Sequence, residues 1–339
     1  MVDPRPREQL GLDDHVSAHI MKTALGDYFY KEFEEYRINT FNAHANYLLE
    51  TFLNPWVQKA LSSARTPHQA GNSTYMGVIV DDRPTRALRF SILNTILMGR
   101  LKMPVMLITS PTSYSKMKEL LGDIGDWITI ENTSNKDIKV IDRNTYNNLF
   151  RDSCFWAGLP ARKLLIFQAD SLLIEPIDYT MFSYDYVASP WSRSISTTSF
   201  CTYANDLERE KAPFWVTTIN NRELDDRLIF GNGGLSIRNR DVMKGICESE
   251  PSTLDEPEDI YFSRCLLSHD ANLPPLEIAR RFSCEADYYP SIGAHASHLY
   301  LSAERQAEIF ERHFKNLIAL VTASTGHAFC PDRKNNQHH

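Results

Sequence analysis

The chain has 339 residues, of which 42% are hydrophobic, so it can bury a large core in one domain with extensions or in two domains. The net charge is −7 and there is no basic run, which argues against a dedicated nucleic-acid-binding protein. No apolar stretch approaches the roughly 18 residues that a membrane span needs, and residues 1–10 are polar and Pro-rich. We therefore expect a cytoplasmic protein, with peripheral contact at the cytoplasmic face of a membrane left open.

The cysteines form neither a CxxC pair nor a zinc-like spacing. Reduced thiols, several of them buried in the core, fit this pattern. The six are Cys154, Cys201, Cys247, Cys265, Cys284 and Cys330.

Residues 1–70 are predicted to form a helical N-terminal extension. Apolar residues recur at helical spacing from Ile20 to Phe33 and again from Tyr47 to Phe52, and Asn54-Pro55 should interrupt or end the second helix. This extension could pack on the main domain, pair with another subunit to form an oligomer, or lie against a membrane; packing is the interpretation we favour. A linker is expected at 65–73.

Residues 71–300 have the pattern of an α/β domain, in which strands alternate with helices. The spacing predicts a mostly parallel central sheet with helices on its two faces, and residues 301–339 are predicted to form a C-terminal helix, beginning near Ser302, and a polar tail. Neither GxGxxG after the first strand nor GxxxxGK[ST] occurs, which argues against dinucleotide-binding and P-loop proteins. Strands are expected at 75–80, 105–109, 127–130, 138–141, 164–167 and 186–188, with helices at 88–97, 115–121 and 144–156.

The stretch Lys163–Ser171 is the most informative part of this domain. The apolar run Leu164–Phe167 is typical of a strand buried on both faces, and it ends in Gln168-Ala169-Asp170. In open α/β sheets, ligands lie beyond the carboxyl ends of the strands, so Asp170 is placed where a ligand or metal would bind. An ordinary turn with Asp170 as its turn former is the competing interpretation.

Two further motifs follow. Gly231-Asn232-Gly233-Gly234 leads into an apolar strand, and its glycines allow positive φ and a close approach of the backbone to a ligand, although Asn-Gly is also an ordinary hairpin turn. Pro257 precedes Glu258 and Asp259 at a helix start, where acidic residues are favourable simply through the helix dipole.

Together these motifs resemble glycosyltransferases of the GT-A fold. More closely, they are similar to a poorly characterised family of glycosyltransferase-like proteins found in bacteria, fungi and large viruses. The matching strings, from Tyr75 to His298, are LIFQADSLL, YDYVASPW, GNGGLSIRN, PEDIYFSR and IGAHASH. The pair GNGGLSIRN and PEDIYFSR is fairly specific. The single carboxylate in QAD departs from the Asp-x-Asp motif of the fold, which puts metal dependence in doubt.

The resemblance implies a GT-A-like fold and a divalent cation, Mn²⁺ or Mg²⁺, held by Asp170 and completed by a C-terminal histidine, for which His295 is the candidate. A carboxylate and phosphate oxygens suit such a cation, which neutralises the leaving nucleoside diphosphate. A loop histidine with no special role is the alternative for His295.

By resemblance to inverting members, Asp259 is the expected general base for the acceptor hydroxyl, and Glu258 would help to bind the acceptor. The helix dipole keeps such a carboxylate ionised, as a base requires. A retaining enzyme would not use these roles.

The remaining candidates bind substrate. Gln168 joins Asp170 at the donor, and Asp81, Asp82 and Arg83 stand after the first strand, where the nucleotide base and ribose bind in similar proteins. Arg86 or Arg89 could meet phosphates; a solvated charged turn is the alternative. Residues expected at the sugar or the acceptor are Trp191, which is equally suited to a core, and Asn232, Gly233 and Gly234.

The expected function is transfer of a sugar from a nucleotide sugar, with UDP as the favoured nucleotide, to a hydroxyl of a glycan or lipid-linked acceptor. One alternative is a sugar nucleotidyltransferase, although Asp81-Asp82-Arg83-Pro84 is not the Gly-rich basic loop that such an enzyme carries. The other is a non-catalytic protein that uses the same fold to bind a glycan or a partner.

Overall fold

The computed structural model describes residues 35–61, 74–134, 138–190, 231–252, 257–266, 268–285 and 288–325. The expectations for the helix at 20–33, the linker at 65–73, Trp191, and the polar tail after residue 325 lie outside these ranges.

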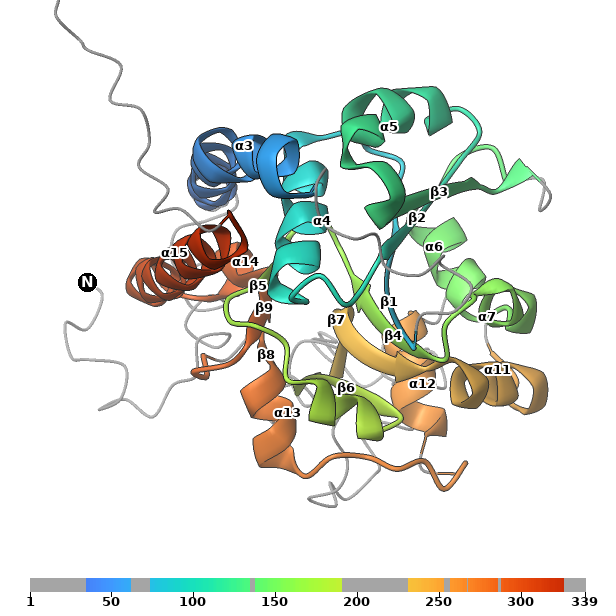
Figure 1. Cartoon of the computed structure of the whole chain (residues 1–339). Coiled ribbons are helices and arrows are strands. Elements are labelled where there is room, and N and C mark those ends of the chain that lie inside the picture. Colours follow the sequence, from blue (N-terminus) through green and yellow to red (C-terminus); the bar gives the residue numbers. More distant parts are fainter. Residues whose placement is uncertain are drawn as a thin grey trace, which may run out of the picture.

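A six-stranded sheet forms the centre of the domain, with the strand order β3-β2-β1-β4-β7-β6 (Figure 1). The pairs β3-β2, β2-β1 and β1-β4 are parallel, and β7 runs antiparallel to both of its neighbours. The predicted α/β fold with a mostly parallel sheet is confirmed. The strands are β1 (Tyr75–Val80), β2 (Val105–Thr109), β3 (Ile128–Asn132), β4 (Lys163–Phe167), β6 (Tyr186–Pro190) and β7 (Gly231–Asn239).

Successive residues of β4 enter two different hydrophobic cores, as expected for a strand buried on both faces. Leu165 and Phe167 lie in the core under one face, whereas Leu164 and Ile166 lie in the core under the other. Helices cover both faces, as Figure 1 shows. The first face packs against residues 41–61, α4 (Arg86–Met98), α5 (Tyr114–Leu121) and α15 (Ala303–Thr325), and the second against α6 (Arg143–Phe150), α7 (Ser153–Gly158), α11 (Arg240–Ser249) and α12 (Glu258–Cys265).

The described part of the N-terminal extension packs on the domain. Trp56 is fully buried, and its indole N–H donates to Ser324 Oγ of α15 at 2.9 Å. The helix does not end at Asn54-Pro55: it continues to Leu61, with π-helical turns η1 (Leu49–Leu53) and η2 (Val57–Leu61) on either side of α3 (Asn54–Trp56). Pro55 lies in the first turn of α3, where the missing N–H is tolerated.

Two predicted elements differ from the structure. Residues 138–141 form no strand, because the Ile141 N–H donates to the Asp82 carboxylate at 2.7 Å instead of joining a ladder. The helix expected at 144–156 is divided into α6 and α7, because the Asp152 side chain accepts from the Cys154 N–H and caps a new helix there.

A small second sheet, in the order β5-β9-β8, lies beside the main one. It consists of β5 (Ser171–Leu173), β8 (Ser283–Cys284) and β9 (Gly293–His295), and it pairs Ser171 with His295. Asp170 and His295, 125 positions apart in the sequence, are therefore neighbours in space. The short helices α13 (Leu276–Phe282) and α14 (Ser297–Tyr300) flank these strands.

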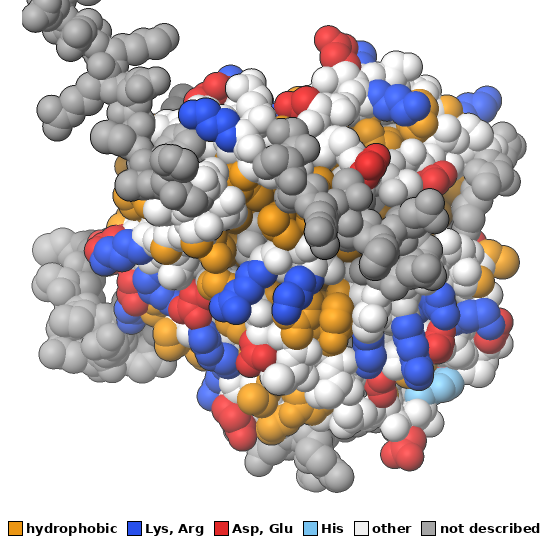
Figure 2. Space-filling model, in the orientation of Figure 1, with side chains coloured by type: hydrophobic (Ala, Val, Ile, Leu, Met, Phe, Trp, Pro, Cys, Tyr) orange, Lys and Arg blue, Asp and Glu red, His pale blue; other side chains and the backbone are white. Residues whose placement is uncertain are grey.

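Acidic and basic side chains are interspersed on the face of the molecule drawn in Figure 2. Among the helices that the structure describes, none is long and apolar enough to cross a lipid bilayer.

Candidate functional site

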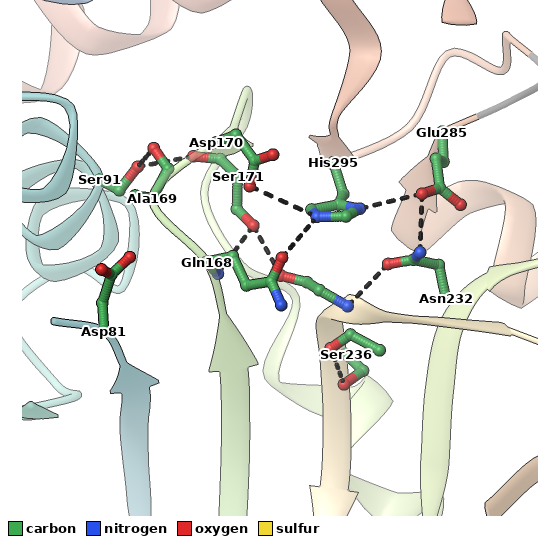
Figure 3. A network of polar contacts seen from close by, with 12 residues as sticks. Asp81, Ser91, Gln168, Ala169, Asp170, Ser171, Asn232, Ser236, Glu285 and His295 are labelled. Atoms are coloured by element: carbon green, nitrogen blue, oxygen red, sulfur yellow. Dashed lines mark hydrogen bonds and ion pairs between the residues drawn. The ribbon is translucent and has the colours of Figure 1, made fainter. Parts of the chain in front are cut away.

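Polar residues gather where β1 and β4 end and β7 begins (Figure 3). Asp81 follows β1, and Gln168 and Asp170 follow β4. Because parallel strands end at the same edge of the sheet, this is the edge at which α/β proteins bind ligands.

The turn after β4 is held by serine hydroxyls on both sides. Ser171 Oγ accepts from the Gln168 N–H at 3.0 Å and donates to the Gly234 carbonyl at 2.6 Å. From α4, Ser91 Oγ contacts the carbonyl oxygens of Ala169 and Ser171 at 2.8 and 2.9 Å. Asp170 therefore does occupy a turn, but one whose backbone is fixed on both sides.

His295 connects this turn to the far side of the site. Its Nε2 lies 3.1 Å from Gln168 Oε1 and 3.4 Å from Asp170 Oδ1, and its Nδ1 lies 3.1 Å from Glu285 Oε1. Burial alone would lower the pKa of His295, but the charges and hydrogen bonds of Asp170 and Glu285 raise it to about 10. Burial alone would raise the pKa of Asp170, yet His295 and then His298 lower it to about 2.

Glu285 extends the cluster to β7. Its Oε1 also accepts from Asn232 Nδ2 at 2.7 Å, and Asn232 Oδ1 accepts from the Gly234 N–H at 2.6 Å. The Asn232 amide is thus held by the protein on both its oxygen and its nitrogen. Figure 3 shows the His295 ring between Gln168 and Asp170 on one side and Glu285 on the other.

The glycines at the start of β7 make room for side chains. A Cβ at Gly233 would lie 2.0 Å from Glu258 Oε1, and a Cβ at Gly234 would lie 2.1 Å from His295 Nε2. Residues 231–234 form part of the strand and no hairpin turn, and none of these glycines has a positive φ. The expectation of close approach is therefore met by side chains of the protein itself. The expected turn is wrong because the segment belongs to β7, and Gly231 pairs with Pro190 of β6.

Gly234→Ala should displace the His295 ring, because the added methyl group overlaps it and the neighbouring backbone is fixed by Ser171. We expect the His295 imidazole resonances to move in an NMR spectrum. Gly245→Ala is the matched control, since a Cβ there meets no atom within 4 Å. Unchanged His295 resonances in Gly234→Ala would contradict this packing.

Asp259 and Glu258 begin α12 but have different surroundings. Glu258 forms a buried ion pair with Arg238, at 2.6 and 3.0 Å. Asp259 is half-buried, and it accepts from the Gly233 N–H at 3.4 Å and the Ile260 N–H at 2.9 Å. Burial, followed by the charges of Glu258 and Glu285, raises the pKa of Asp259 to about 7.

Arg238 lies in an aromatic cage. Its guanidinium carbon is 5.1–5.9 Å from the centres of four rings, and its Nε donates to Ser236 Oγ at 2.9 Å. The rings belong to Phe150, Trp156, Tyr186 and Phe262. Glu258 is thus engaged by a cation inside the protein, which leaves its expected contact with an acceptor as a prediction.

A pocket of about 360 Å³ adjoins the cluster at the ends of β1 and β4. Arg83 closes one side, with its backbone N–H, Nε and Nη2 all donating to the Asp81 carboxylate. Hydrogen bonding to Asp81, against burial, raises the pKa of Arg83, and the charge of Asp170 adds to this. The lining residues include Asp81, Asp82, Arg83, Asp142, Tyr146 and Gln168.

The other expected donor-binding residues lie elsewhere or have structural partners. Asp82 accepts from Thr109 Oγ1, the Ser110 N–H and the Ile141 N–H, so its carboxylate ties three segments together. Arg86 pairs with Glu50, and Arg89 pairs with Asp123 at 2.6 Å. Both arginines line a separate pocket beside the N-terminal helix.

Three residues in or beside the site were not among those expected from the sequence: Glu285, Arg238 and Tyr146. Glu285 and Arg238 look like ordinary surface charges in the sequence, and only their burial in the fold distinguishes them. Tyr146 lies in the predicted helix at 144–156, but nothing local indicated that it would reach the pocket.

These features define an α/β protein with a mostly parallel sheet whose carboxyl edge collects buried polar residues. Residues 129–299, just over half of the chain, match a family described as a protein of unknown function (DUF5672), and the chain belongs to this family. No curated protein matches the chain.

Solved structures of glycosyltransferases are among those to which the fold is similar. The apo-form glycosyltransferase GlyE of Streptococcus pneumoniae TIGR4 has 11% sequence identity and a TM-score of 0.39 over 74% of this chain and 62% of that chain. The galactosyltransferase LgtC, in complex with donor and acceptor sugar analogs, has 12% identity and a TM-score of 0.36 over 70% of this chain and 95% of that chain. The match thus spans somewhat less than two thirds of the length of GlyE.

Proposed function

We propose that this protein is a GT-A-like glycosyltransferase that moves a sugar from a nucleotide sugar, with UDP as the favoured nucleotide, to a hydroxyl of a glycan or lipid-linked acceptor. One observation carries the proposal: Asp259, a half-buried carboxylate with a pKa of about 7, accepts from the Gly233 N–H, and the adjacent Gly234 packs against His295, which joins Asp170 and Gln168 in one cluster. A base and a cluster that can hold a cation for the diphosphate are what sugar transfer from a nucleotide sugar requires.

The residues present fit a divalent cation. Oxygen ligands of Mg²⁺ lie at about 2.0–2.1 Å in an octahedron, so that neighbouring ligands are about 3 Å apart. Gln168 Oε1 and Asp170 Oδ1 lie at 3.1 and 3.4 Å from His295 Nε2, close to that spacing. The described residues include no group of three His, Cys, Asp or Glu side chains suited to a metal, so the amide oxygen of Gln168 and the phosphates of the donor would complete the set.

Glu285 supports this use of His295. Nδ1–H donates to Glu285, and Nε2 faces two further oxygen acceptors; a cation that displaces the Nε2 proton would find a lone pair there. Such a convergence is repulsive unless a proton or a cation lies between the three atoms. A cation bound there would supply positive charge to the departing nucleoside diphosphate.

The remaining steps belong to side chains of the chain itself. Asp259 would accept the proton of the acceptor hydroxyl as its oxygen attacks the anomeric carbon. The bond from that carbon to the phosphate oxygen breaks, and its electron pair leaves with the nucleoside diphosphate. Asp81 and Arg83 would hold the nucleoside in the pocket that they line.

A thermal-shift panel of nucleoside diphosphates, each with and without Mn²⁺, tests the proposal. We expect UDP with Mn²⁺ to raise the melting temperature, because a ligand that binds only the folded state stabilises it by mass action. The shift should be lost in Asp170→Ala and kept in the control Asp126→Ala, which changes an exposed carboxylate remote from the cluster.

The other outcomes of the thermal-shift panel distinguish between the remaining functions. Stabilisation that is independent of Mn²⁺ would keep the transferase and remove Asp170 as a metal ligand. No response to any nucleotide would contradict the transferase and favour the non-catalytic binding protein.

A further inference from the structure

The hydroxyl group of Tyr146 is buried and makes no hydrogen bond of ordinary geometry with the residues that the structure describes, although the Gln168 side chain lies close enough to act on it. Tyr146 lies on α6, with its ring centre 4.6 Å from that of Phe150, and it lines the same pocket as Asp81, Arg83 and Gln168. A buried donor without an acceptor costs free energy, and in native proteins such groups need a reason.

The phenol is a neutral donor under all ordinary conditions. Burial, and then the charge of Glu258, raises its pKa, whereas Arg238 acts in the opposite direction. It can therefore offer its proton to an acceptor on a molecule in the pocket, but it cannot act as a base.

The surrounding charges select the kind of acceptor. The charges of Glu258, Arg238 and Asp259 act on the Tyr146 hydroxyl, and the neutral Gln168 side chain acts on it through hydrogen bonding. The charge of Arg238 is already matched by Glu258 through two hydrogen bonds, which leaves Asp259 as the uncompensated carboxylate. An anionic phosphate oxygen would be repelled by that carboxylate, whereas the neutral hydroxyl of a sugar can accept from Tyr146 and donate to Gln168 or Asp259.

We propose that Tyr146 donates a hydrogen bond to a hydroxyl oxygen of the transferred sugar and thereby helps to select that sugar. The inference rests on the proposed function. It places the sugar between the Gln168–Asp170–His295 cluster and Asp259, beside the nucleotide pocket.

Tyr146→Phe tests this, because it removes only the hydroxyl. By calorimetry with UDP, UDP-glucose and UDP-galactose in the presence of Mn²⁺, we expect the variant to bind the preferred UDP-sugar about 10-fold more weakly, while its affinity for UDP stays within about 2-fold of wild type. Without ligand, the variant should melt at the same or a higher temperature, because an unpaired buried donor is gone. Tyr36→Phe is the matched control, since Tyr36 is 64% exposed on the N-terminal helix.

Each other result overturns the inference in a recognisable way. If Tyr146→Phe weakens the binding of UDP and of the UDP-sugar equally, the Tyr146 hydroxyl donates to a phosphate instead of the sugar. Unchanged affinity for all three ligands would remove Tyr146 from the site while leaving the transferase in place. A lower melting temperature without ligand would show that the hydroxyl has a structural partner. If the wild-type protein binds none of the three ligands, both the proposed function and this inference are contradicted.

Discussion

Asp259→Asn should lower the rate of sugar transfer by about 10²–10⁴-fold, the usual contribution of a general base, while binding of the UDP-sugar stays nearly unchanged. Asparagine keeps the shape and one acceptor for the N–H groups of Gly233 and Ile260 but cannot take up a proton. Transfer is measured by release of UDP with a panel of acceptors, and binding by calorimetry. Substantial transfer by the variant would contradict the assignment.

The pH dependence provides a second measure of the same residue. Because the pKa of Asp259 is raised to about 7, the wild-type rate should rise with pH through about 7 as the carboxylate ionises. Stability should change in the opposite direction. The folded protein binds this proton more tightly than the unfolded chain, so the free energy of unfolding falls as pH rises from about 4 to about 7. Asp259→Asn should therefore melt higher than wild type above pH 7, and the difference should vanish below about pH 4.

Arg238→Met should destabilise the protein by about 3–5 kcal/mol, because it leaves Glu258 buried without its cation. The side chains of Arg238 and Glu258 are 0% and 4% exposed, and the Glu258 carboxylate packs against the backbone at Gly233. The free energy of unfolding is measured by urea denaturation at pH 7.

Two further variants test whether the loss of stability comes from the buried charge of Glu258. Lys244→Ala removes one partner of an exposed ion pair on α11 and should change the free energy of unfolding by less than about 1 kcal/mol. The double variant Arg238→Met/Glu258→Gln should recover part of the loss, because no buried charge remains. A loss of less than about 1 kcal/mol in Arg238→Met alone would mean that the pair is open to water.

The bounds of β1 and β2 agree with prediction because each is a short apolar run bounded by polar residues, a signal that lies wholly within the strand. The GNGG segment shows where such local signals fail. Asn-Gly commonly forms turns, but here the segment extends strand β7, and its pairing with β6 at Gly231 overrides that preference. The missing strand at 138–141 has a similar cause, since its Ile141 N–H bonds to Asp82, 59 positions earlier.

Some residues of the candidate site could also be predicted from the sequence, whereas others could not. The resemblance suggested Asp170 and His295 as partners, and the fold places them 3.4 Å apart. It did not suggest Glu285, whose contact with Asn232 spans 53 positions, or the aromatic cage of Arg238, which four separate elements build. Burial and long-range contact determine what these charged residues do, and neither is visible in a local pattern. The metal, donor, acceptor and mechanism stay predictions.

The two-sided burial of β7 has a consequence for how this chain can vary. Leu235 and Ile237 point into the hydrophobic core under one face of the sheet, whereas Arg238 points into the aromatic cage on the other face. Losing one residue within the strand would exchange these faces, placing a guanidinium among leucines and leaving the cage without its cation. Apolar substitutions of similar size can be absorbed at Leu235 and Ile237, whereas an insertion or deletion in β7 would reverse its two faces, so we expect length changes to avoid this strand.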